Sequence, residues 1–236
     1  MLQEKKTIIK VLLLNGSPRP NHNTAKALNA AKEGAENAGA ETEIINLFKI
    51  KDLKGCYSCY RCQRDEFDKS NPMCCVKDSL SPVLEKARAA DVVIVGSPVY
   101  FYYPTSETMA FMNRFLFPKL SYINNAAYSP DFKVVNPKRI GCIFTMNSPV
   151  DYFEASGEAK IIGHLADASK SVYGYGESLF MVQTAAFDDY KGLQFSEQFV
   201  KSQQAYYKEH FPKDLEKARE LGKRLVDEVV AEKMSV

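Results

Sequence analysis

The sequence predicts an α/β fold, an open five-stranded parallel sheet with helices on both faces. Short apolar runs alternate five times with segments of helical periodicity along the 236 residues, and this alternation is typical of strand–helix–strand crossovers. The first run is almost continuously apolar, as in strands buried on both faces. We expect a single domain over residues 1–236, with two irregular excursions at residues 55–77 and 117–137.

Each predicted element follows from its local pattern. The strands are short apolar runs, expected at Ile8–Leu14, Glu43–Leu47, Asp91–Gly96, Arg139–Thr145 and Ser178–Thr184. The helices are segments that repeat apolar residues on one face, expected at Thr24–Ala38, Ser79–Ala90, Thr105–Leu116, roughly Glu154–Ser169, and Pro212–Glu232. Gly39 supplies a stop after the first helix.

The composition excludes several classes of protein. Lysine and arginine number 31 against 29 aspartates and glutamates, with both signs scattered, whereas a nucleic-acid groove needs one sign concentrated on one face. The apolar run near the N-terminus is too short to span a membrane, and no signal-peptide cleavage site follows it. We therefore expect a cytoplasmic protein that binds neither nucleic acid nor membrane, with cysteines that are reduced thiols or ligands.

The loop after the first strand predicts an anion site. Ligands of open parallel sheets bind at the carboxyl ends of the strands, and a helix N-terminus there offers free N–H groups and a positive dipole end. Arg19 adds a fixed charge suited to phosphate. Ser17, Asn23 and Thr24 offer further donors. Helix capping by Asn23 or Thr24 is compatible with the same role.

The loop after the third strand, GSPVYFYYPTS, presents four consecutive aromatic residues between two prolines. Such a loop suits a flat heteroaromatic ring, with backbone amides at the ring edge and a side chain over one face. Aromatic packing in the core or between subunits would produce the same pattern, so this loop alone does not decide between them.

These motifs together resemble one known family. The stretches GSPRPNHNT, AADVVIVGSPVYF and ETMAFMNRF, with a cysteine-rich segment at residues 55–77 between the first two, are similar in order and spacing to flavodoxin-like NAD(P)H-dependent FMN reductases, near the iron–sulfur flavoprotein branch. The similarity covers roughly residues 8–116 and continues more weakly to the last strand. It implies a flavodoxin-like fold that binds FMN, in a homodimer or homotetramer.

The resemblance also implies which residues hold the cofactor. Ser17, Arg19, Asn23 and Thr24 would bind the FMN phosphate. Two further loops would line the isoalloxazine, through Pro98, Val99, Tyr100, Phe101, Thr145, Met146 and Asn147. His22 departs from the family pattern, which has glycine there. If the position requires a positive φ, histidine is tolerated with more backbone strain than glycine.

The implied reaction has two half-reactions. NAD(P)H passes hydride to the flavin, and a small acceptor such as a quinone or free flavin then takes the same place, with no protein acid–base pair required. The alternative is an iron–sulfur flavoprotein that carries electrons between ferredoxin-like partners and an acceptor. A flavin-free interaction module is a third possibility, disfavoured because the phosphate loop is intact.

The cysteine segment leaves several alternatives open. Cys56, Cys59 and Cys62 repeat with two residues between them, and Cys74 and Cys75 follow after eleven more. Three closely spaced thiolates plus a fourth suit a 4Fe-4S cluster, with Cys74 or Cys75 as the fourth ligand. Zinc, a thiol–disulfide pair, or no metal would also fit. The gap is longer than in cluster-bearing relatives, which favours no metal. Cys142, within a strand, is expected to be a buried small apolar residue.

Overall fold

The structure is a computed structural model that describes residues 8–64, 66–67, 70–120, 134 and 136–235. Its sheet has the strand order β2-β1-β3-β5-β6, with these five strands parallel, and β4 (Tyr103–Pro104) pairs antiparallel with β3. The parallel strands are β1 (Lys10–Asn15), β2 (Glu41–Asn46), β3 (Val92–Tyr100), β5 (Arg139–Thr145) and β6 (Glu177–Met181). This order confirms the predicted flavodoxin-like α/β fold.

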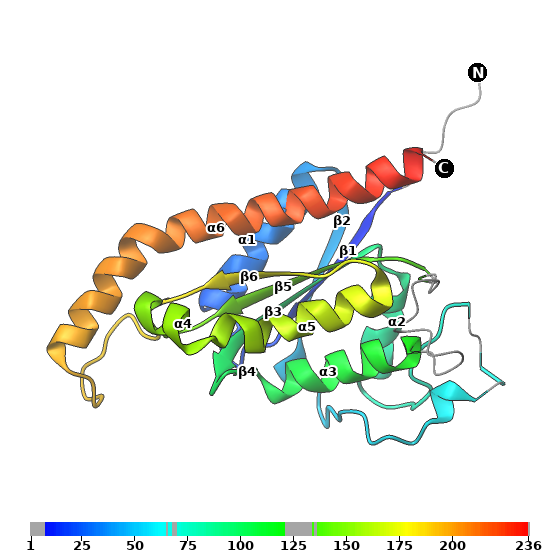
Figure 1. Ribbon diagram of the computed structural model, residues 1–236, viewed down its shortest axis with the longest axis horizontal. Coiled ribbons are helices and arrows are strands. Elements are labelled where there is room, and N and C mark those ends of the chain that lie inside the picture. Colours follow the sequence, from blue (N-terminus) through cyan, green and yellow to red (C-terminus); the bar gives the residue numbers. More distant parts are fainter. Residues whose placement is uncertain (1–7, 65, 68–69, 121–133, 135, 236) are drawn as a thin grey trace.

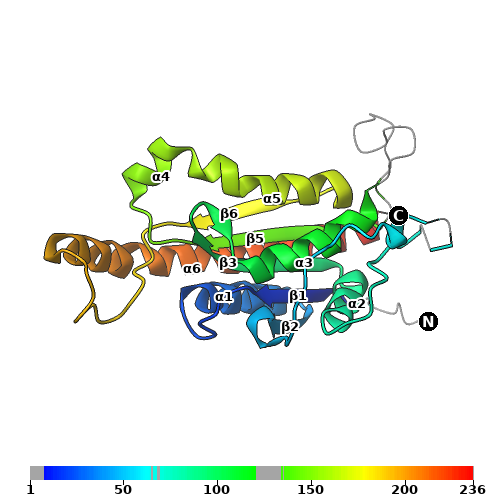
Figure 2. The ribbon, with the colours of Figure 1, turned by 90° about the horizontal axis from the view of Figure 1, so that it is seen from below.

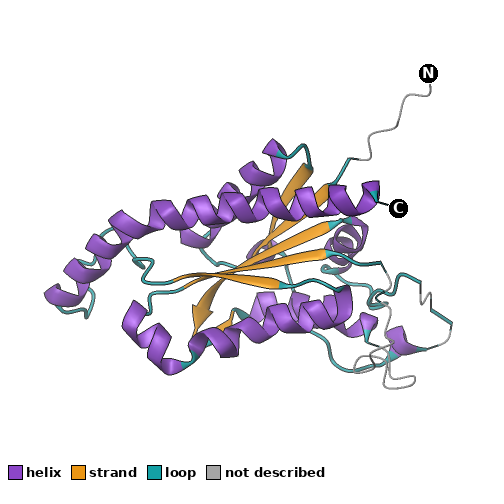
Figure 3. Cartoon of the chain, turned by 45° about the horizontal axis from the view of Figure 1, so that its top comes forward, coloured by secondary structure: helices purple, strands orange, loops and turns teal. Residues whose placement is uncertain are grey.

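Helices cover both faces of the sheet (Figures 1 and 3). One face carries α1 (Asn23–Asn37) and α6 (Glu197–Met234), and the other carries α2 (Ser81–Ala89), α3 (Ser106–Leu116) and α5 (Glu158–Tyr173). Successive residues of a strand point to opposite faces. Leu12 and Leu14 accordingly pack into the core beneath α2, α3 and α5, whereas Val11 and Leu13 pack beneath α1 and α6. Both faces of the central strands are therefore apolar.

Helices α1 and α6 approach each other closely through two glycines. A Cβ atom on Gly34 would lie 1.9 Å from the carbonyl oxygen of Arg219, and one on Gly222 would lie 1.9 Å from that of Ala31. Only glycine permits backbones to meet at such a distance. This contact holds α6 against α1.

The last helix begins earlier than the sequence pattern predicted. It starts at Glu197 and contains Pro212, which we expected at its first turn. Proline inside a helix removes one hydrogen bond, and the residue four positions earlier, Lys208, is exposed to solvent, which can hydrate the freed carbonyl. The helix bends along its length in Figure 1. The predicted start at Pro212 was therefore wrong, because the helix already includes Glu197 and the residues that follow it.

Smaller differences have local causes. The helix predicted over Glu154–Ser169 is divided by Gly157, whose φ of 70° ends α4 (Val150–Ser156) and precedes α5. Strand β3 continues past the predicted Gly96 to Tyr100 because β4 folds back onto it. In the predicted 117–137 excursion, Phe117–Lys119 forms a short 3-10 helix, and residues 121–133 and 135 lie outside the described part of the chain. No helix among the described residues is long and apolar enough to cross a membrane.

Candidate functional site

The loops after β1, β3 and β5 meet at one pocket at the carboxyl edge of the sheet. The order in which the chain adds strands to the sheet reverses between β1 and β3. Ligands usually bind at the carboxyl edge beside this point in such folds. The pocket includes every residue of the expected cofactor set except Phe101; its lining is Ser17, Arg19, His22, Asn23, Thr24, Pro98, Val99, Tyr100, Thr145, Met146, Asn147, Thr184 and Ala186.

The first loop turns tightly because its backbone is bonded to the neighbouring strand. The Gly16 N–H donates to the Gly96 carbonyl at 2.8 Å, and a Cβ atom at Gly16 would lie 1.9 Å from the Thr108 hydroxyl oxygen. The Ser17 N–H donates to the Asn15 side chain at 3.0 Å. Glycine is therefore required at position 16 so that the loop can lie against α3.

Helix α1 begins at the pocket without a side-chain cap. His22 occupies the N-cap position with φ −94° and ψ −165°, and its side chain makes no capping hydrogen bond. This φ is ordinary for histidine, so the position does not require glycine. Uncapped N–H groups of a first turn attract anions. Burial, followed by the charges of Arg19 and Lys26, lowers the pKa of His22 below its ordinary 6.5.

Two expected phosphate ligands are tied to the segment that follows β6. Asn23, which is 4% exposed, donates both amide hydrogens, to the Thr184 carbonyl at 2.6 Å and the Ala185 carbonyl at 3.0 Å. Arg19 donates to the Ala186 carbonyl, and its guanidinium lies 5.4 Å from the Phe187 ring centroid. The Asn23 side chain thus fixes the loop in place, and its backbone N–H is the donor that α1 presents at this residue.

The second loop is a tight hairpin of aromatic residues. Val99 pairs with Pro104 and Tyr100 with Tyr103, and the two turn residues, Phe101 and Tyr102, have φ of 49° and 69°. Positive φ at both central residues is the pattern of a two-residue hairpin turn, and it directs Phe101 outward, where 92% of its surface is exposed. Phe101 therefore stands apart from the pocket that Tyr100 lines.

The third loop, which follows β5, is bonded to the other two segments around the pocket. The Thr145 hydroxyl lies 2.7 Å from that of Thr24. The Met146 N–H donates to the Met181 carbonyl at 3.0 Å, and the Met146 carbonyl accepts from the Thr184 N–H at 2.9 Å. The side-chain oxygen of Asn147 is buried and has no hydrogen-bond partner among the described residues. A buried acceptor of this kind calls for a donor from a ligand or water.

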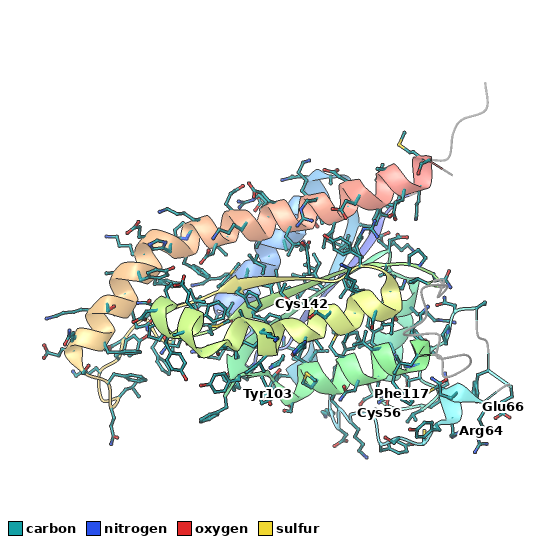
Figure 4. The ribbon with its side chains drawn as sticks, viewed as in Figure 1. Cys56, Arg64, Glu66, Tyr103, Phe117 and Cys142 are labelled. Atoms are coloured by element: carbon teal, nitrogen blue, oxygen red, sulfur yellow. The ribbon has the colours of Figure 1, made fainter. Side chains whose placement is uncertain are left out.

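The five cysteines of the 55–77 segment line a second pocket, together with Arg114 and Phe117. Figures 2 and 4 show this segment at the opposite end of α3 from the β3–β4 hairpin. Burial, then the neighbouring Cys74, raises the pKa of Cys62 to about 11. As placed, no three His, Cys, Asp or Glu side chains among the described residues form a group that could hold a metal ion. Cys142 is fully buried in β5, as expected of an apolar residue.

Helix α6 supplies a part of the site that the sequence pattern did not predict. Gln203 donates to the Asn147 carbonyl at 3.0 Å, and the Tyr207 hydroxyl donates to the Asn23 side-chain oxygen at 2.9 Å. Both lie before Pro212, in the stretch left without a predicted helix. The signal was present in the repeat of four between Phe199, Gln203, Tyr207 and Phe211, which places these side chains on one face of a helix.

Solved structures with a similar fold include two reductases. An NAD(P)H:quinone oxidoreductase from Methanothermobacter marburgensis superposes with a TM-score of 0.60 at 13% identity, over 93% of this chain and 98% of that one. An azoreductase from Bacillus anthracis gives 0.61 at 12% identity, over 92% and 100%. At this identity the similarity concerns the fold.

Sequence relatives come from the iron–sulfur flavoproteins. One from Archaeoglobus fulgidus is 38% identical over 95 residues, which are 39% of this chain and 42% of that protein. One from Methanocaldococcus jannaschii is 35% identical over 106 residues, 45% of this chain and 51% of that protein. The matches thus span about half the length of these relatives. The model of the NADPH-dependent FMN reductase family matches residues 9–145, and the chain therefore belongs to that family.

Proposed function

We propose that this protein is an FMN-dependent oxidoreductase that takes hydride from NAD(P)H and reduces a small acceptor such as a quinone or free flavin. The observation that carries the proposal is the convergence of three loops on one pocket, with an uncapped helix N-terminus at one end and an aromatic wall at the other. FMN, when bound, supplies the hydride chemistry, whereas the protein binds and orients it.

The phosphate end would be held by the first turn of α1. Its N–H groups and positive dipole end attract a phosphate, and Ser17, Arg19 and Thr24 line the same end of the pocket. Arg19 uses one of its five N–H donors on the Ala186 carbonyl, so others are available to an anion. Asn23 would contribute through its backbone N–H.

The ring end would be lined by the second and third loops. Pro98, Val99 and Tyr100 form one wall, and Tyr100 is half exposed, so that the pocket stays open beside it. The third loop lines the same pocket through Thr145, Met146 and Asn147. Residues that sequence analysis assigned to the ring therefore surround one pocket, with Phe101 outside it.

An open pocket favours alternating use of one site. NAD(P)H and the acceptor would occupy the exposed side in turn, since the sequence has no separate dinucleotide fingerprint. We further propose a cytoplasmic homodimer or homotetramer, in keeping with the family. Anaerobic mixing of FMN-loaded protein with NADPH or NADH should bleach the flavin absorbance, and a quinone should restore it. An FMN-loaded protein that neither nicotinamide reduces would contradict the proposed activity.

A second candidate, an iron–sulfur flavoprotein that carries electrons from a ferredoxin-like partner, rests on the cysteine pocket. A 4Fe-4S cluster requires four thiolates, and the candidates are Cys56, Cys59, Cys62 and either Cys74 or Cys75. All of them line one pocket, although as placed no three of them form a group that could hold a metal ion. Iron and sulfide analysis of protein purified without air distinguishes the candidates. Near-stoichiometric iron and sulfide, lost in Cys62→Ala, supports the carrier; metal-free protein supports the reductase without a cluster.

A further inference from the structure

We infer that Tyr207 is a positioning residue for the phosphate end of the proposed flavin site and acts through Asn23. Its hydroxyl donates to the Asn23 side-chain oxygen at 2.9 Å, and this orients the amide so that both its hydrogens reach the carbonyls of Thr184 and Ala185. The inference deepens the proposed function, on which its ligand-binding part rests.

The contacts form one continuous chain of hydrogen bonds. The Lys26 ammonium donates to the Tyr207 oxygen at 3.3 Å, which makes the hydroxyl a better donor to Asn23 because bonds in a chain polarise one another. Asn23 is the first residue of α1, and Lys26 lies in its first turn. The hydrogen-bonded chain therefore joins the start of α1, the N-terminal third of α6 and the segment after β6.

Packing holds Tyr207 in this place. Its ring stacks on Phe211 one turn later, with centroids 4.6 Å apart and planes at 20°. One turn earlier, Gln203, which is 1% exposed, donates to the Asn147 carbonyl of the third loop. This face of α6 thus contacts two of the three loops that line the pocket, and Tyr207 makes its contact at the phosphate end.

Tyr207 should therefore affect one end of the proposed site, the end that binds phosphate. A phosphate at α1 needs the first-turn N–H groups held at a fixed place and angle, and Asn23 fixes them by its bonds to the 184–185 carbonyls. Removing the Tyr207 hydroxyl takes away one of the three hydrogen bonds that hold the amide and so loosens it. The effect should fall on ligands that carry the phosphate, FMN, and spare riboflavin, which has the same ring without it.

The test compares Tyr207→Phe with Tyr206→Phe. Tyr206 is the adjacent residue on α6, and its ring stacks on His210 and takes no part in the chain described above. Fluorescence titration of the apoprotein should show an FMN dissociation constant about five-fold higher in Tyr207→Phe, the typical effect of one lost hydrogen bond, with riboflavin affinity unchanged and Tyr206→Phe like wild type. Equal weakening of both ligands, or no weakening, would overturn the inference.

Two further measurements separate this inference from the proposed function. In a double-mutant cycle, Tyr207→Phe should add nothing on an Asn23→Ala background; additive losses would contradict action through Asn23. Hydrogen exchange of ligand-free protein should be faster at residues 19–26 and 183–187 in Tyr207→Phe than in Tyr206→Phe. This second readout holds whether or not wild type binds FMN, and unchanged exchange would overturn the positioning role by itself.

Discussion

The guanidinium of Arg114 and the carboxylate of Asp78 form a two-point ion pair, with Nη1–Oδ2 at 2.6 Å and Nη2–Oδ1 at 3.1 Å. Arg114 is 2% exposed and also donates to the carbonyls of Lys54 and Val76 at 3.1 Å each. These carbonyls lie at the two ends of the cysteine segment, Lys54 just before Cys56 and Val76 just after Cys75. One buried side chain on α3 therefore fixes both ends of that segment.

Replacing this arginine should destabilise the protein. In Arg114→Met, Asp78 loses its ion-pair partner and the carbonyls of Lys54 and Val76 each lose one donor, although the Ser81 hydroxyl still donates to Val76. We expect a loss of about 2–4 kcal/mol in the free energy of unfolding, somewhat below that of a fully buried pair because Asp78 is partly exposed. Urea unfolding measures it. Arg64→Met, an exposed arginine of the same segment, should change stability by less than about 0.5 kcal/mol. Equal effects of the two variants would contradict the proposed role of Arg114 in holding both ends of the cysteine segment.

The same ion pair predicts a pH dependence. Burial acts to raise the pKa of Asp78, but the hydrogen bonds and charge of Arg114 outweigh it and lower this pKa below 3.8. A carboxylate with a lowered native pKa stabilises the fold above its unfolded pKa, and this contribution is lost as pH falls toward the native pKa. The stability difference between wild type and Asp78→Asn should thus be largest near neutral pH and shrink below 3.8. A difference that grows with acidification would refute this.

The contact of α1 with α6 should not tolerate a methyl group. Gly222→Ala would place Cβ against the Ala31 carbonyl, and we expect a loss of about 1–3 kcal/mol from the resulting overpacking. The control is Gly163→Ala in α5, where the nearest atom to an added Cβ is 3.8 Å away; alanine should there stabilise the helix by up to about 1 kcal/mol. Thermal unfolding of both variants distinguishes the sites, and a harmless Gly222→Ala would contradict the close approach.

His22 should report on phosphate binding. In the ligand-free protein the pKa of His22 lies below 6.5 because of burial and the charges of Arg19 and Lys26. A bound phosphate favours the imidazolium and should raise this pKa, so FMN should also bind relatively more tightly as the imidazole gains its proton. An NMR titration with and without FMN measures the change, and His164 on α5, away from the pocket, serves as the control. An unchanged His22 pKa would place the phosphate elsewhere.

The two neighbours Tyr100 and Phe101 should behave differently. Tyr100 lines the pocket, whereas Phe101 is exposed at the hairpin turn. Tyr100→Ala should weaken FMN binding about ten-fold, the loss of one aromatic contact, and Phe101→Ala should leave the affinity within about two-fold because its ring makes no pocket contact. A larger effect at Phe101 than at Tyr100 would show that the aromatic loop closes over the ligand differently from this structure.

The sequence indicated the sheet and most of the pocket because these depend on local patterns. Apolar runs identify buried strands, and parallel strands necessarily bring their carboxyl ends to one edge, which is why Ser17, Pro98 and Thr145 meet. The outward direction of Phe101 depends on two positive φ angles that aromatic residues rarely adopt. The part played by Tyr207 depends on a helix that continues through Pro212, which local propensity argues against.

The most direct test of the central claim is titration of FMN into the apoprotein, with absorbance and fluorescence recorded together. We predict saturation at one FMN per chain, quenched or shifted flavin signals, and weaker binding in Gly16→Ala, whose Cβ would displace the first loop from Thr108. Flavin absorbance and fluorescence that stay those of free FMN throughout the titration, or binding that Gly16→Ala leaves unaffected, would contradict the assignment of this pocket to FMN.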